Sequence, residues 1–147
     1  MRSLPIAAVV SMGLASAAHA APQVQAAWSR PAAQGTTGAG FMTLANPGPK
    51  PDALVAVASP LAGQVMIHQS AMAGGVASMK MVAQVPLPPG GHVTFAPGGY
   101  HVMFVGLTRA LKLGDTLPAT LTFASGARVK ASFVVGLTPP VAPVPKP

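Results

Sequence analysis

Histidine and methionine side chains are the residues of this chain that could do chemistry. Together, imidazole and thioether groups make a soft to borderline donor set, which suits Cu(I) and does not suit Mg²⁺, Ca²⁺ or Mn²⁺. Zinc sites use Cys, His and carboxylates, so two His with Met make a poor zinc site. Taken singly, each Met is more often a core filler and each His a hydrogen-bonded core or rim residue. Six candidate donors fall within 36 positions: His68, Met72, Met79, Met81, His101 and Met103.

The run YHVMFVGL (100–107) places two of these donors on one side of a predicted strand. Successive side chains of a strand point to opposite faces. Tyr100, Val102 and Phe104 therefore share one face, which we expect to pack in the core. His101 and Met103 share the other face and present two donors side by side.

The composition excludes most catalytic chemistry. There is no Cys, and Asp52 and Asp115 are the only acidic residues. The chain therefore has no thiol nucleophile, no paired carboxylates for hydrolysis and no oxygen-rich site for a hard cation. It has no G-x-S-x-G elbow and no Walker or Rossmann phosphate loop. We predict that it is not an enzyme, and the lack of Cys also disfavours a blue-copper electron-transfer site.

Nine Lys and Arg residues outnumber the two acids. A nucleic-acid interface would need these cations in a cluster. They are instead scattered singly along the chain, which favours a solvated surface over nucleic-acid binding.

The first twenty residues, MRSLPIAAVVSMGLASAAHA, have the three parts of a cleavable secretory signal peptide, with cleavage expected after Ala20. The remaining chain is long enough for one domain and one hydrophobic core. No later run approaches the length of a membrane span, so we expect no membrane insertion. These features predict an exported, periplasmic protein.

Short β-favouring runs separated by Pro- and Gly-rich turn clusters predict an all-β sandwich or barrel. No stretch has a sustained helical period. We predict one β-sandwich domain over residues 21–136, followed by a Pro-rich disordered tail over 137–147. The predicted strands are 24–30, 39–46, 53–59, 64–70, 92–96, 100–107, 117–124 and 127–135.

The spacing H-x10-M-x21-H-x-M resembles the copper-binding signature of the periplasmic PCuAC copper chaperones. The blocks AAWSR, GFMTLAN, ASPLAGQVMIHQSAMAGGVASMKM and VTFAPGGYHVMFVGLTRALKLGDTLPATLTFASG also resemble that family, in its order, so the resemblance runs from about Val24 to Val135. It implies a cupredoxin-like Greek-key β-sandwich that binds one Cu(I) at an exposed edge and works as a monomer. The implied acceptors are the CuA centre of cytochrome c oxidase, a Sco-type thiol protein, or both. Carried over position by position, the implied ligands are His68, Met79, His101 and Met103.

Two features depart from the family pattern. Where relatives often place acids after the first ligand, this chain reads HQSAMAGG, and its tail lacks the His and Met found in some relatives. Among the other donors, we expect Met72 to pack in the core or as a lid and His92 to lie on the surface. Met81 lies two residues from Met79 and could point the same way.

Two other functions stay open at this point. The protein could store copper or confer resistance without delivering the metal. It could also be a metal-free interaction module whose methionines simply fill the core.

Overall fold

The structure is a computed structural model that describes residues 20–140. The predicted signal peptide and most of the predicted tail therefore lie outside the described residues. Within them the chain forms strands and no α-helix, so the predicted all-β class is confirmed. No helix in this part of the chain has the length and apolarity of a membrane span. The strands are β1 (Gln23–Ser29), β2 (Gly38–Ala45), β3 (Asp52–Ala58), β4 (Ala62–Ala73), β5 (Val76–Met81), β6 (Val85–Leu87), β7 (His92–Phe95), β8 (Tyr100–Leu107), β9 (Thr116–Phe123) and β10 (Arg128–Val135).

Alternating burial explains why these segments fold as strands. In the β9–β10 hairpin, Leu121, Phe123 and Phe133 are buried, whereas the intervening Lys130 and Ser132 face solvent. This pattern packs one face of each strand against the core and leaves the other face exposed to solvent. The same rule separates the two faces of β8, where Val102 and Phe104 are fully buried as predicted.

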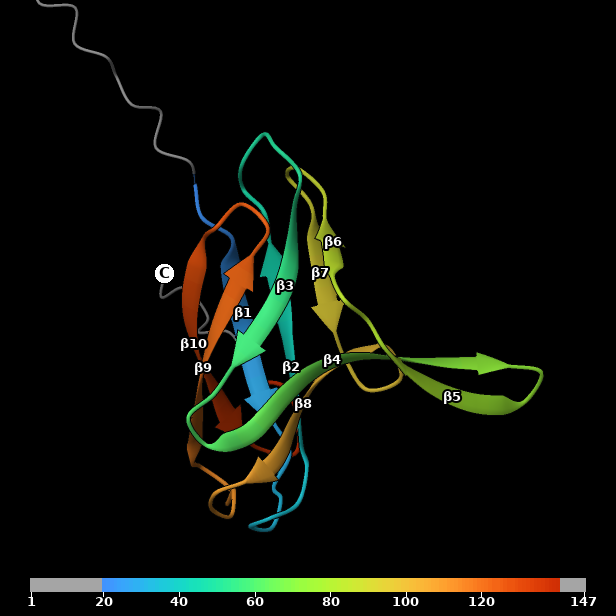
Figure 1. Cartoon of the computed structure of the whole chain (residues 1–147), viewed down its shortest axis with the longest axis vertical. Helices are drawn as coiled ribbons and strands as arrows, with labels where there is room; N and C mark the ends of the chain where they lie inside the picture. Colours follow the sequence, from blue (N-terminus) through green and yellow to red (C-terminus); the bar gives the residue numbers. More distant parts are fainter. Residues whose placement is uncertain (1–19, 141–147) are drawn as a thin grey trace, which may run out of the picture.

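The strands form one continuous sheet with the order β5-β4-β8-β2-β1-β10-β9-β3-β6, and β7 pairs with β2. The β1–β10 pair is parallel, and the other pairs are antiparallel. In Figure 1, β3 and β9 lie in front of β1 and β2, so two layers of strands enclose the core. The largest fully buried side chains of this core are Phe95, Phe104, Phe123, Phe133 and Met42.

The far end of β4 leaves the body of the protein and forms a projecting arm with β5 (Figure 1). The arm turns at Gly74 and Gly75, whose φ angles of 58° and 78° favour glycine. The predicted strand 64–70 is too short, because β4 runs from Ala62 to Ala73. Met79 lies within β5, a strand that the sequence did not predict.

Gly40 of β2 provides a test of how tightly the core holds the strand beside β8. A Cβ at this position would lie 2.7 Å from Phe104 Cε2 and 3.1 Å from the Phe133 ring. Both rings are fully buried and have no free volume to move into. We expect Gly40→Ala to lower the free energy of unfolding by about 1–3 kcal/mol, measured by urea denaturation.

Gly63→Ala is the matched control, because its added Cβ would meet nothing closer than 3.7 Å. It should leave the free energy of unfolding within about 1 kcal/mol of the wild-type value or raise it. Equal losses in the two variants would contradict the overpacking explanation.

Candidate metal centre

His68 and His101 come together because β4 and β8 pair in antiparallel register. The two residues are direct cross-strand partners, and their ring centroids lie 5.7 Å apart with an interplanar angle of 81°. An imidazole nitrogen binds a metal at about 2.0 Å, so two rings that share one ion lie about 5 to 6 Å apart. The observed ring separation fits a common ion.

Each of these imidazoles buries one nitrogen that has no hydrogen-bond partner. The orphaned atoms are Nδ1 of His68 and Nε2 of His101, and within residues 20–140 no other buried side-chain nitrogen or oxygen lacks a partner. Leaving a buried polar atom unpaired costs about 1–3 kcal/mol. A metal ion bound between the rings would satisfy both nitrogens at once.

The other nitrogen of His101 fixes which atom is free to coordinate. His101 Nδ1 lies 3.2 Å from the carbonyl oxygen of Gly99 and donates to it. The proton therefore resides on Nδ1, and Nε2 keeps its lone pair. A backbone carbonyl that accepts from the far side of the ring is the usual support of a metal-binding histidine.

Two thioethers flank the imidazole pair on the same face of the sheet. Met103 follows His101 by two residues, and Met66 is its direct partner on β4. Both are partly buried. Met66 had no predicted role, although the run MIH places it two residues from His68 just as HVM places Met103 two residues from His101.

The arm continues this face outward with three further methionines. Met81 is the direct partner of His68, Met79 is the partner of Ser70, and Met72 lies one row farther out. All three are exposed. Core packing of Met72 was therefore a wrong expectation, because β4 has already left the body at that point.

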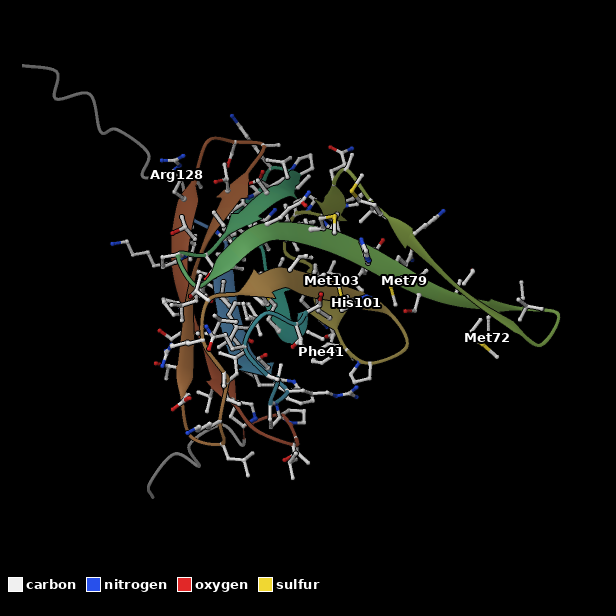
Figure 2. The ribbon with its side chains drawn as sticks, turned by 60° about the horizontal axis from the view of Figure 1, so that its bottom comes forward. Phe41, Met72, Met79, His101, Met103 and Arg128 are labelled. Atoms are coloured by element: carbon white, nitrogen blue, oxygen red, sulfur yellow. The ribbon has the colours of Figure 1, made fainter. Side chains whose placement is uncertain are left out.

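The four predicted ligands thus share one face, at different depths. His68, His101 and Met103 lie on neighbouring positions of β4 and β8. Met79 lies one row farther along the arm, and Figure 2 shows it between the imidazole region and Met72. His101 is only 5% exposed, whereas Met79 is 56% exposed. The expected exposed edge is therefore buried at the imidazole end and open at the thioether end.

An aromatic pair lies on β1 and β2, beside the strand that carries His101. β2 pairs with β8 from Gly38 to Gly40 and with β7 from Met42 onward, so Phe41 lies where β2 changes partner. The Phe41 ring packs against Trp28 at a centroid distance of 4.8 Å, and the Arg30 guanidinium lies 5.5 Å from its centroid. The His101 ring is itself buried and lies edge-on to the His68 ring.

No carboxylate takes part in the centre. Within the described residues no three His, Cys, Asp or Glu side chains are grouped to hold an ion. Asp115 accepts from the Lys112 backbone N–H. Burial raises the pKa of Asp52, but hydrogen bonds from Ser125 and Ala53 outweigh this effect and leave the pKa below its usual value. The donors at the centre are therefore uncharged nitrogen and sulfur atoms, which suit a soft monovalent ion.

A protein-family model matches nearly all of the described chain. The family model described as "Putative lipoprotein LpqE-like" matches residues 22–135. A protein of Leifsonia xyli subsp. xyli, named "Putative lipoprotein Lxx21020", is 31% identical over 106 residues, which are 71% of this chain and 63% of that protein. The aligned part thus spans less than two thirds of the relative's length.

Solved structures with the same fold include three PCuAC-related proteins. The apo PCuAC domain from PmoF1 has a TM-score of 0.66 and 29% identity, covering 80% of this chain and 94% of that chain. The copper-bound PCuAC domain from PmoF2 has a TM-score of 0.65 and 27% identity, covering 78% and 91%. The CuI-DR1885 structure from Deinococcus radiodurans has a TM-score of 0.60 and 35% identity, covering 82% of each chain. The predicted cupredoxin-like fold and the resemblance to PCuAC proteins are confirmed.

The hydrogen bond to Gly99 predicts the tautomer of His101 in the metal-free protein. We expect the proton on Nδ1 and none on Nε2, because only Nδ1 has an acceptor. Long-range ¹H–¹⁵N spectra of the imidazoles distinguish the two tautomers. A protonated Nε2 with a bare Nδ1 would contradict this assignment, and the exposed His92 supplies a reference imidazole in the same spectrum.

Proposed function

This chain belongs to the LpqE-like family, and we propose that it is a PCuAC-type copper chaperone. In this proposal it binds one Cu(I) through His68, Met79, His101 and Met103 and delivers the ion to a copper-accepting protein. The pair of buried, unpartnered imidazole nitrogens carries the proposal. In a metal-free interaction module these two nitrogens would be a stability cost without a purpose.

The donor set explains how such a carrier both holds and releases its ion. Imidazole and thioether ligands bind Cu(I) well but carry no charge, so a thiolate acceptor competes effectively for the same soft ion. The ion can then be delivered when charged thiolates of the acceptor replace the neutral imidazole and thioether ligands of this protein. No redox change of the protein is needed for this transfer.

The depth of the ligands indicates which side the acceptor approaches. His101 is buried, whereas Met79 is exposed on the arm (Figure 2). An incoming ligand can therefore reach the ion from the arm, where Met79 is the most exposed of the four proposed ligands.

Chemistry and context define the acceptor we propose. The acceptor presents thiolates, or another copper site, that bind Cu(I) more tightly than this centre does. The CuA-bearing subunit of an oxidase and a Sco-type thiol protein would both meet this requirement. Delivery would take place after export to the periplasm. Residues 1–19, which hold nearly all of the predicted export signal, lie outside the described residues.

The central test is an anaerobic Cu(I) titration of the purified protein against a chromophoric Cu(I) chelator. We expect one tight ion for each chain. His101→Ala and Met103→Ala should each weaken binding by at least about tenfold, or 1.4 kcal/mol, because each removes one donor. His92→Ala, which changes an exposed histidine on β7, should leave the affinity unchanged.

Unchanged affinity in both the His101 and Met103 variants would overturn the proposed ligand set. Circular dichroism of each variant separates lost donors from lost folding. A loss of affinity without a change in the β-sheet spectrum supports direct ligation.

A deletion strain separates delivery from storage. If the protein delivers copper, we expect oxidase activity to fall at limiting copper and to recover when copper is added. If it only buffers copper, oxidase activity should be normal at limiting copper, and growth should suffer only when copper is in excess. The measurement is cytochrome oxidase activity in membranes across a copper series.

A further inference from the structure

Methionines of the arm continue the donor face of the imidazole pair toward its tip. The antiparallel register pairs Ser70 with Met79 and places Met72 in the next row. Met79 is therefore a diagonal neighbour of His68 on one side and of Met72 on the other. Diagonal cross-strand neighbours lie about 7–8 Å apart, within reach of long side chains.

The exposure of these thioethers argues against a packing role. Met42, a true core residue, is 2% exposed, whereas Met72 is 71% exposed. Met79 and Met72 together line a shallow hollow with Ser70 and Gly98. Both thioether side chains therefore border the same small, solvent-open space.

Met81 shares the face but not the hollow. It is 68% exposed, nearly as much as Met72, and it lies opposite His68 rather than beside Ser70. It does not line the hollow that Met72 and Met79 share. Met81 therefore resembles Met72 in type and exposure while differing in position.

We propose that Met72 and Met79 form a second, outer site for one soft monovalent cation, Cu(I), between the arm strands and the turn at Gly98. The proposal rests on the proposed function for the inner ligands. Met79 serves both positions, because it lies between His68 and Met72 in the register. The outer site is the weaker one, since it has two thioethers and no imidazole.

The step between the two sites is a ligand exchange. The Cu(I)–sulfur bond to Met79 stays, the bonds to the His68 and His101 nitrogens and to the Met103 sulfur break, and a bond to the Met72 sulfur forms. Every ligand involved is neutral, so the step moves no proton and no electron. The ion leaves the buried end of the face and reaches the exposed arm, where an acceptor can take it.

The test uses Ag(I), a redox-stable soft monovalent ion, added to the full chain labelled with ¹³C at its methionine methyl groups. The first equivalent should shift the imidazole signals together with Met79 and Met103. The second equivalent should shift Met72 and shift Met79 again. Met72→Leu should keep the first ion and lose the second, whereas the matched control Met81→Leu should bind both.

The outcomes separate the inference from the proposed function. If the first equivalent leaves the imidazole signals unmoved, the inner ligand set fails. If the imidazoles respond but binding stops at one ion, or if Met72→Leu still binds two, the outer site alone is overturned. Chemical shifts of the β8 core methyl groups, such as Val102, show that each variant is folded.

Discussion

The pairing register of β4 with β8 is the constraint on which the rest of the centre depends. It sets His68 opposite His101 and Met66 opposite Met103. A slip of one residue would turn every side chain of a strand to the other face, moving the imidazoles into the core. Burial of Ile67, Val102 and Phe104 on the opposite face prevents such a slip. The hydrophobic core therefore fixes the positions of donors that it does not itself contain.

The imidazole end of the donor face is more deeply buried than the arm. His101 is 5% exposed at the inner end, and Met79 and Met72 are 56% and 71% exposed on the arm. The inner end offers rigid, desolvated nitrogens whose unpaired state costs stability, as functional sites often do. The outer end offers flexible thioethers on a two-stranded ribbon, which needs support from the body to be stable. The inner end of the face is thus suited to retaining the ion, and the outer end is suited to releasing it.

The sequence predicted this arrangement where short-range pattern decides the structure. Alternation in 100–107 assigned Val102 and Phe104 to the core and His101 and Met103 to the other face, as the structure has them. The arm was not predicted from the sequence, because its Ala, Ser and Gly residues have little intrinsic preference for strands. The β5 segment is a strand because it pairs with β4, and a pairing partner is not visible in local composition. The burial of His101 was equally hidden, since β8 lies between β2 and β4, whose pairing with it is not visible in local sequence.

The lack of nearby acids sharpens the selectivity of the centre. An anionic ligand would favour a divalent or harder ion, whereas neutral sulfur and nitrogen donors favour Cu(I). The one charged residue of β5, Lys80, alternates with Met79 and Met81 and so lies on the opposite face of the arm. Exposure also has a chemical cost, because a solvent-facing thioether is open to oxidation to a sulfoxide. A sulfoxide offers a hard oxygen in place of soft sulfur, so the openness that lets an acceptor reach Met79 also makes it the most vulnerable of the four proposed ligands.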